Sequence, residues 1–284
     1  MNLKETSFLA SQFLLPHHLV SRLAGSIAES ELPFIKNPMM KFFLNRFGID
    51  LSEAERTRIS DYNNFNDFFT RALNAKARPI MGSKNDWISP VDAQISQVGS
   101  IEGGQLIQAK GKTFTLTELL GSDHTTSEHY QNGQFVTLYL SPKDYHRIHM
   151  PMAATLLKTT FVPGKLFSVN PLTANNVSRL FARNERLVCE FDSHQGRFIM
   201  VLVGAMVVAS IETTWAGIVA PFQRRIQQQQ FNSQSISFAK GEEMGRFRLG
   251  STVIMIFEEN QMNWHEDIRT ETKVRMGQLI SRNG

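Results

Sequence analysis

The chain has 284 residues, of which 42% are hydrophobic and 20% are charged, so it can fold as a globular protein with a sizeable core. Its net charge of +4 is mild and dispersed, which argues against a nucleic-acid binder but suits an anionic membrane surface. The single cysteine, Cys189, excludes an intrachain disulfide and, with no Cys/His pattern at metal spacing, argues against structural zinc.

The amino-terminal part, to about residue 75, is predicted to be helical. Its first residues lack the charge pattern of a secretory signal, so we expect a cytoplasmic protein. In "NPMMKFFLNRFG", Met39, Phe43 and Phe47 fall at i, i+4 and i+8, and Gly48 is the expected stop. This stripe fits either a helix packed on the protein's own core or an interfacial helix that inserts Met and Phe among lipid headgroups.

The stretch "FNDFFTRALNAKARPI", residues 65–80, predicts a further amphipathic helix that ends before Pro79. The following linker, "ARPIMGSKND", is the best candidate for a boundary. We therefore expect a helical, membrane-contacting region at residues 1–80 and a β-rich catalytic domain at residues 81–284.

From Trp87 onward, short apolar segments alternate with Gly, Pro or Asn turns, which is typical of a mainly antiparallel β domain. The longest apolar run, "FIMVLVGAMVVASI" at residues 198–211, is too short for a spanning helix and is rich in valine, so it predicts one or two buried strands. The expected fold class is α+β, with amphipathic helices followed by this β-rich part.

Several side chains that can move protons stand near predicted strand ends. His146 and His149 lie three apart in "LSPKDYHRIHMP", with no acidic or cysteine neighbour that would complete a metal site. Asp92 stands among small and apolar residues in "SPVDAQI". With Ser251, these residues could form an Asp-His-Ser arrangement, although their spacing alone does not show that they meet.

The last strong strand begins unusually. Val253 to Phe257 form an unbroken apolar run, as expected of a strand buried on both faces, but "GST" precedes it. Gly250 is either an ordinary bulge followed by solvated hydroxyls or a backbone position that chemistry requires.

Four motifs together resemble the bacterial type of phosphatidylserine decarboxylase proenzyme: "FNDFFTRALNAKARPI", "SPVDA", "YHRIHMP" and "LGST". They occur in the order found in that family, and the likeness runs from about residue 30 to about residue 280. The resemblance implies a carboxy-lyase of phospholipid biosynthesis that converts phosphatidylserine to phosphatidylethanolamine. It also implies a peripheral protein on the cytoplasmic face of the cell membrane.

The resemblance further implies that this zymogen cuts itself between Gly250 and Ser251. Ser251 Oγ would attack the Gly250 carbonyl, with His149 taking its proton and Asp92 orienting the His149 ring. β-Elimination of the resulting ester would separate a β chain, 1–250, from an α chain, 251–284. The dehydroalanine left at position 251 would hydrolyse to a covalent pyruvoyl cofactor with loss of ammonia. That group would form a Schiff base with the substrate amine, and His146 would act as the proton donor.

The implied partners are phosphatidylserine, the membrane surface and the two chains of one precursor, which should stay together as a heterodimer and could form a higher oligomer. Two other interpretations remain open from the residues alone. A serine hydrolase using Asp92, His149 and Ser251 would keep an intact chain, but the sequence lacks the G-x-S-x-G elbow. A non-catalytic, lipid-binding β module would need neither histidine.

Overall fold

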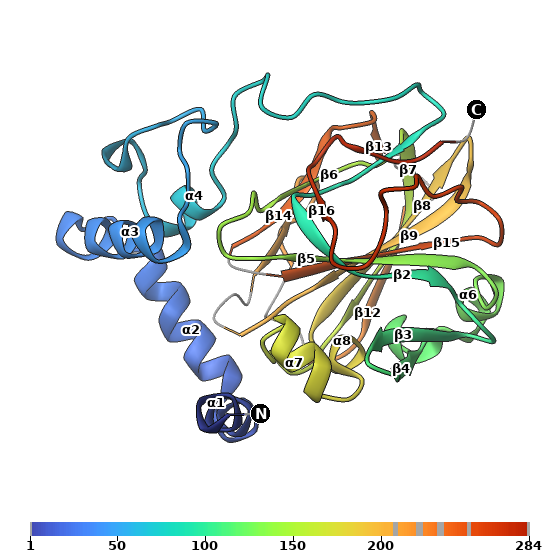
Figure 1. The fold of residues 1–284 in the computed structure, drawn as a ribbon, viewed down its shortest axis with the longest axis horizontal. Coiled ribbons are helices and arrows are strands. Elements are labelled where there is room, and N and C mark those ends of the chain that lie inside the picture. The colour runs from blue at the N-terminus through green and yellow to red at the C-terminus, as the bar shows by residue number, and fades with distance from the viewer. Residues whose placement is uncertain (1, 207–209, 220–223, 232–235, 249–250, 283–284) are drawn as a thin grey trace.

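The computed structural model describes residues 2–206, 210–219, 224–231, 236–248 and 251–282. Gly250, one half of the expected cleavage site, lies outside the described residues. The described part consists of amino-terminal helices followed by a mainly antiparallel β-rich region, which confirms the α+β class (Figure 1).

Three helices, α1 (Leu3–Leu14), α2 (His17–Ala28) and α3 (Pro33–Phe47), form one side of the molecule (Figure 1). Asn2 and Glu5 close the start of α1 with a capping box. Gly48 ends α3 with a φ of 63°, a left-handed conformation that suits glycine. The helical prediction is thus confirmed up to this residue.

The prediction of a helix over residues 65–80 is wrong. Only a short 3₁₀ turn, η1 (Ile59–Asp61), and a five-residue helix, α4 (Phe65–Phe69), follow α3 before the first strand. After α4 the chain turns back toward residues 53–55: Leu73 forms a β-bridge with Ala54, and Asn74 donates its backbone N–H to the Glu53 carbonyl. These tertiary contacts use the backbone groups that a longer helix would need.

The Met39/Phe43/Phe47 stripe packs against the protein's own core. The Phe43 ring lies 4.6 Å from the Phe65 ring and 5.0 Å from the Phe47 ring, measured between centroids. The neighbouring Met40 is fully buried. Of the two alternatives for this stripe, the structure therefore supports core packing.

A large sheet forms the centre of the β-rich region, with the strand order β12-β7-β8-β9-β15-β5-β2-β16 and with β13 also paired to β7 (Figure 1). Its pairings are antiparallel. The strands are β2 (Ala93–Ser100), β5 (Gln134–Leu140), β7 (Ala154–Val162), β8 (Arg186–Ser193), β9 (Gly196–Val203), β12 (Gln227–Gln230), β13 (Ile236–Phe238), β15 (Ser251–Phe257) and β16 (Lys273–Val274).

Strand β15 lies between β5 and β9 and is buried throughout. Val253 and Met255 belong to the hydrophobic cluster on one face of the sheet, and Ile254 and Ile256 belong to the cluster on the other face. This arrangement explains the unbroken apolar run in the sequence, because both alternating sets of side chains need apolar partners.

Smaller elements surround the large sheet. A second sheet has the order β11-β10-β14-β6, and two-stranded sheets join β1 to β17 and β3 to β4. These strands are β1 (Trp87–Ile88), β3 (Gln105–Ala109), β4 (Lys112–Thr115), β6 (Arg147–His149), β10 (Ile211–Thr213), β11 (Gly217–Ile218), β14 (Glu243–Phe247) and β17 (Leu279–Ser281). The short helices are α5 (Leu116–Leu119), α6 (His124–His129), α7 (Pro171–Asn176) and α8 (Leu180–Arg183).

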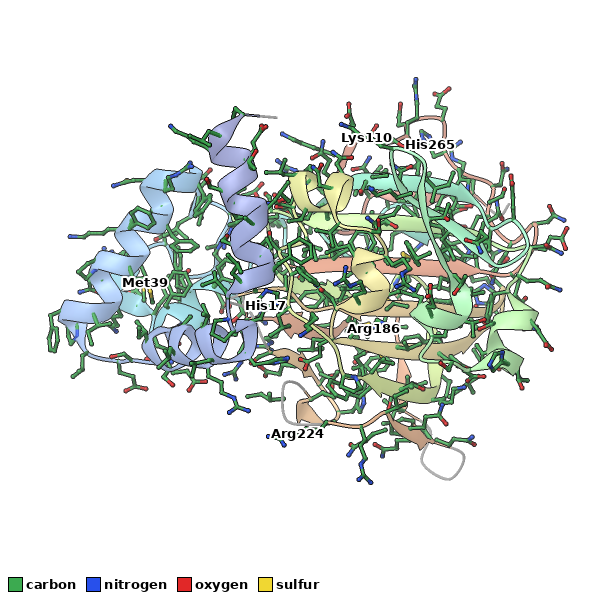
Figure 2. The ribbon with its side chains drawn as sticks, turned by 90° about the horizontal axis from the view of Figure 1, so that it is seen from below. His17, Met39, Lys110, Arg186, Arg224 and His265 are labelled. Atoms are coloured by element: carbon green, nitrogen blue, oxygen red, sulfur yellow. The ribbon has the colours of Figure 1, made fainter. Side chains whose placement is uncertain are left out.

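Two buried polar side chains tie the parts together (Figure 2). His17, at the start of α2, accepts a hydrogen bond from the Leu166 backbone N–H at 3.2 Å, which links the helices to the β-rich region. Arg186, on β8, donates to backbone carbonyls of Leu119 and Ala182 and so holds α5 and α8 against the large sheet. Both contacts use side chains to satisfy backbone groups that burial would otherwise leave unpaired.

Candidate active site

Ser251 is the first residue of β15 and lies opposite Leu140, the last residue of β5. Its side chain is completely buried, and its Oγ has no hydrogen-bond partner among the described residues. A buried hydroxyl without a partner is costly, and such groups concentrate where a reaction or a ligand uses them. The expectation of solvated hydroxyls at this strand start therefore does not hold for Ser251.

The two histidines lie on the segment that continues from β5. The His146 carbonyl accepts the Phe247 backbone N–H at 3.0 Å, and His149 is the register partner of Glu243 in the pairing of β6 with β14. β14 is the strand that precedes Ser251 in the sequence. Both histidines therefore lie beside the strand that comes just before the expected cleavage site. His146 is next to the end of β14 that is closer in sequence to Ser251.

His146 is fully buried against the Phe69 ring, with centroids 4.1 Å apart. Its Nδ1 lies 2.8 Å from the Asp144 carbonyl, which can only accept, so Nδ1 carries the proton in the neutral ring. Its Nε2 is buried and has no partner in the described part of the chain. Burial lowers the pKa of His146 to about 3, so the ring is neutral near pH 7 and presents an unpaired nitrogen lone pair.

His149, like His146, is held through Nδ1 by a backbone carbonyl, but its Nε2 has a hydrogen-bond partner. Its Nδ1 donates to the Gly241 carbonyl at 2.8 Å, and its Nε2 accepts the Tyr145 hydroxyl at 2.9 Å. Burial lowers the pKa of His149, and the hydrogen bond to Gly241 opposes that shift. His149 is therefore a neutral base whose lone pair is covered by a single phenol.

Asp92 is buried at the start of β2 and is held by two groups. Arg78 donates to it through Nε at 2.8 Å, and the Met276 backbone N–H donates at 2.8 Å. The segment beside it contacts His149, because the Pro90 carbonyl accepts the His149 backbone N–H at 2.9 Å. Within the described residues, however, no hydrogen bond joins the Asp92 carboxylate to the His149 ring or either ring to Ser251.

A polar cavity of about 440 Å³ adjoins these residues. Asp92 and Tyr145 line it, and Tyr145 is hydrogen-bonded to His149; the two histidines and Ser251 are not among its described lining residues. Its charged lining residues are Asp50, Glu53, Arg71, Arg78, Asp92, Lys143, Asp144, Lys273 and Arg275. Sequence reasoning singled out only Asp92 of this set, although "FFTRALNAKARP" contains both Arg71 and Arg78 seven residues apart.

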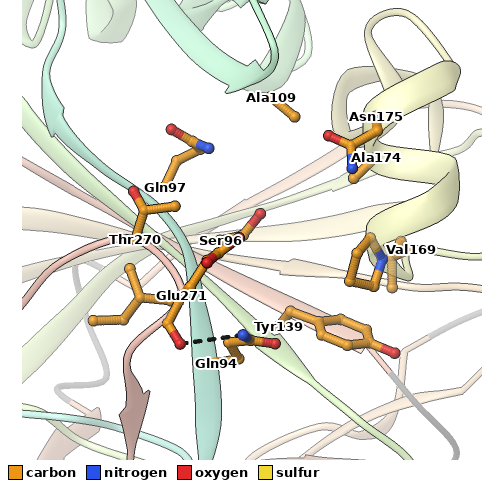
Figure 3. Close-up of a pocket in the computed structure, with 12 residues that line it drawn as sticks. Gln94, Ser96, Gln97, Ala109, Tyr139, Val169, Ala174, Asn175, Thr270 and Glu271 are labelled. Carbon is orange, nitrogen blue, oxygen red and sulfur yellow. Dashed lines mark hydrogen bonds between the residues drawn. The ribbon is translucent and has the colours of Figure 1, made fainter.

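A second cavity of about 120 Å³ lies between β2, β5 and α7 (Figure 3). Gln94 and Tyr139 are on one side of it and Asn175 on the other, and Gln94 donates to the Glu271 carbonyl. Glu271 supplies its one charged side chain, and the cavity contains none of the proton-transfer residues above. We therefore place the candidate active site at the larger cavity.

Comparison with known proteins shows relatives that match this chain over nearly its whole length. Residues 65–282 match the family model described as phosphatidylserine decarboxylase, and residues 7–48 match a second model described as PSD. The chain is 50% identical over 281 residues to the phosphatidylserine decarboxylase proenzyme of Ectopseudomonas mendocina, covering 98% of both chains. It is also 50% identical to the proteins of that name from Hahella chejuensis and Bordetella pertussis, covering 95% and 96% of those chains and 99% of this one.

Proposed function

The chain belongs to the phosphatidylserine decarboxylase family, and from that premise we propose that its catalytic group is made from its own Ser251. The enzyme decarboxylates phosphatidylserine to phosphatidylethanolamine, a reaction of phospholipid biosynthesis. The proenzyme names of its relatives imply self-processing. The proposed cut lies between Gly250 and Ser251 and separates a β chain, 1–250, from an α chain, 251–284.

One observation carries this proposal: Ser251 is buried at the start of a strand, and its Oγ has no partner among the described residues. The hydroxyl is not engaged elsewhere and is available to attack the preceding carbonyl. Attack replaces the Gly250–Ser251 peptide bond with an ester. β-Elimination then releases Gly250 as a carboxylate and leaves dehydroalanine at position 251, which takes up water and loses ammonia to become a pyruvoyl group.

The same position fits a pyruvoyl group. Conversion to pyruvoyl removes Oγ with the Gly250 carboxylate and turns Cβ into a methyl group, which forfeits no side-chain hydrogen bond, because Ser251 Oγ makes none within the described residues. The pairing of β15 with β5 holds the backbone in place. When present, the group supplies an electron sink for the pair released as CO₂ departs. The chain's own contribution is to bury this position and to supply two neutral imidazoles, His149 on β6 and His146 just before it.

The proposed roles of the remaining residues divide between the two reactions. His149, supported by Asp92, would take the proton of Ser251 during self-cleavage, and His146 would return a proton to the substrate carbon after CO₂ loss. Both neutral rings and the backbone contact between His149 and Pro90 support this assignment. It requires the His149 Nε2 to exchange its Tyr145 hydroxyl for Ser251, and Asp92 to act from its ion pair with Arg78.

We also propose that residues 1–80 bind the cytoplasmic face of the membrane peripherally, and that residues 81–284 form the catalytic domain. No helix in the described ranges is long and apolar enough to cross a bilayer. Of the sixteen large hydrophobic side chains exposed in the described residues, eleven lie on or beside α1–α3. They are Leu3, Phe8, Phe13, Leu14, Leu15, Leu19, Leu23, Ile27, Leu32, Phe34 and Phe42.

Intact-mass spectrometry of the purified protein tests the catalytic proposal. We expect chains of 250 and 34 residues (284 − 250 = 34), with the shorter chain beginning in pyruvoyl. Ser251→Ala should remain one uncut chain, and Asp92→Asn and His149→Ala should slow the cut by orders of magnitude. An active preparation that contains only the intact chain would refute the proposal. A folded Asp92→Asn or His149→Ala variant that matures at the normal rate would remove that residue from the relay.

A further inference from the structure

Arg71, two residues after the end of α4, is a buried cation that forms no ion pair among the described residues. Only 4% of its surface is exposed. Its Nη2 donates to the Lys143 carbonyl at 3.0 Å, but Nε and Nη1 are buried and have no hydrogen-bond partner among the described residues. Arg71 lies past the C-cap of α4, Thr70, and so is not part of a helix surface.

An unpaired buried guanidinium is expensive. Desolvating a charge costs several kcal/mol in a protein interior unless hydrogen bonds and an opposite charge offset it. Asp92 and Asp144 act on the Arg71 charge without a hydrogen bond to it: Asp92 pairs with Arg78, and Asp144 accepts two hydrogen bonds from Ser141. Arg71 therefore has donors available for an anion that the chain itself does not supply in its described part.

The cavity beside Arg71 has room and charge for such an anion. Its volume is about 440 Å³. Glu53, on its wall, is already paired with Arg78 and Arg275, whereas Lys143 and Lys273 form no ion pair within the described residues. Once the paired groups are discounted, Arg71, Lys143 and Lys273 remain against Asp50 and Asp144, so the described lining has an excess of one positive charge. The same cavity reaches Tyr145, which is hydrogen-bonded to His149.

We propose that Arg71 binds the phosphodiester of the phosphatidylserine headgroup; this inference rests on the proposed function. The fork of N–H groups on a guanidinium matches two oxygens of a phosphate. The substrate also carries a carboxylate, but that group must leave as neutral CO₂, and pairing it with a buried cation would stabilise the ground state against the reaction. The phosphodiester is unchanged from substrate to product, so binding it costs the chemical step nothing.

Two soluble fragments of the headgroup separate these possibilities. Glycerophosphoethanolamine contains the phosphodiester without the carboxylate, and free serine contains the carboxylate without the phosphodiester. Each is used as an inhibitor of phosphatidylserine turnover by mature wild-type, Arg71→Gln and Arg71→Lys proteins. Arg179→Gln is the matched control, because Arg179 pairs with Glu118 on an exposed surface away from the cavity.

For Arg71→Gln we expect normal cleavage, a KM raised roughly 10- to 100-fold and a smaller change in kcat, since a charge-assisted hydrogen bond contributes about 1.5–3 kcal/mol. Inhibition by glycerophosphoethanolamine should weaken by a similar factor, and inhibition by serine should not change. Arg71→Lys should recover part of the loss, because it restores the charge without the fork. Weakened inhibition by serine alone would assign Arg71 to the carboxylate, and unchanged inhibition by both would make it structural; either result overturns the proposal.

Binding without turnover keeps this test apart from that of the catalytic proposal. The ³¹P resonance of glycerophosphoethanolamine, titrated with Ser251→Ala protein, should report binding that the added Arg71→Lys change weakens. Arg71-dependent binding in a preparation that forms no pyruvoyl would uphold the phosphodiester site while the catalytic proposal failed. Should Arg71→Gln not fold, the lysine variant alone decides, and equal titration curves with and without it would refute the site.

Discussion

Each histidine of "YHRIHMP" is held by the same type of contact, a carbonyl that accepts from Nδ1, yet the two Nε2 atoms meet different surroundings. The His149 Nε2 is covered by the Tyr145 hydroxyl, whereas the His146 Nε2 has no partner in the described part of the chain. Because the carbonyls fix the tautomer, the His146 lone pair is available to a proton without rotation of the ring, whereas the His149 lone pair must first give up the Tyr145 hydroxyl. Because only the His149 Nε2 has a hydrogen-bond partner among the described residues, we expect the two histidines to serve separate steps.

Mutation should separate those steps. His146→Ala is expected to yield the 250- and 34-residue chains with a normal amount of pyruvoyl, but to decarboxylate about 10² to 10⁴ times more slowly, the usual scale for a missing general acid. Carbonyl-reactive labelling and phosphatidylethanolamine formation, measured on one sample, check both parts. A fully labelled and fully active variant would make His146 structural, and an uncut variant would favour a reversed assignment of the two histidines.

Glu185 provides a pH-dependent test of burial. Burial raises the pKa of this carboxyl from 4.5 to about 7. Between these values the folded state keeps a proton that the unfolded chain releases, so stability falls as pH rises through the window, by up to roughly 3 kcal/mol. His146 acts in the opposite sense, because its lowered pKa removes stability as pH falls from 6.5 toward about 3.

Glu185→Gln isolates the first effect, since the amide has a similar shape and does not titrate. Relative to the wild type, its Tm should be higher by several degrees at pH 8 and nearly equal at pH 5. Thermal unfolding followed by circular dichroism at both pH values makes the comparison. A difference in Tm that is the same at the two pH values would show that the Glu185 proton is not the cause.

At the scale of elements, the sequence predicts strands better than it predicts the end of α4. The run from Val253 to Phe257 is β-branched or bulky throughout, so its place inside the sheet follows from composition. The end of α4 depends on the pairing of Leu73 with Ala54, a contact between segments that local propensity cannot reveal. The same limit hid Arg71, whose distinguishing property is that it forms no ion pair among the described residues.

Among the amino-terminal helices, an exposed apolar stripe lies on α2, whereas the stripe singled out in the sequence, on α3, packs inward. On α2, Leu19, Leu23 and Ile27 recur every four residues and are 57%, 60% and 53% exposed, whereas Phe43 on α3 packs inward. Because the three side chains lie on one stripe, they can enter the headgroup region together. Lipid contact is one of the two alternatives that the sequence leaves open for the α3 stripe, and we expect the proposed contact on α2 instead.

Replacing Leu19 and Leu23 by Ser should lower binding to anionic vesicles by at least about tenfold without affecting self-cleavage, since half-exposed leucines contribute little to the core. Flotation of vesicles containing phosphatidylserine measures the effect. The matched control replaces Ile107 and Ile218, which are 49% and 39% exposed on the β-rich part. Equal flotation of both double variants would refute a specific role for α2.

On the scale of the whole molecule, the proposed cut would leave the 34-residue chain paired, strand by strand, with the longer chain. Its strand β15 lies between β5 and β9, β16 pairs with β2, and β17 pairs with β1. Separating the chains would expose the fully buried and mostly apolar β15, together with the side chains that pack on both of its faces. The interface therefore resembles a protein core more than the surface between two subunits.

We accordingly expect the cut chains to elute together in size-exclusion chromatography, even in high salt, and to separate only in denaturant at the concentration that unfolds the sheet. Denaturing electrophoresis of the eluted peak identifies the two chains. Elution of the short chain by itself under native conditions would contradict the observed sheet order.

The sheet order also determines which parts of the protein can fold first during synthesis. The strand at the middle of the sheet is encoded near the end of the chain, whereas the helices with exposed leucines are encoded first. A ribosome releases the chain from its amino terminus, so α1–α3 emerge while β5 and β9 still lack the strand between them. The proposed membrane contact can thus form before Ser251 is even translated, whereas the proposed self-cleavage, which needs β15 in place, must wait until that strand has been made and has paired with β5 and β9.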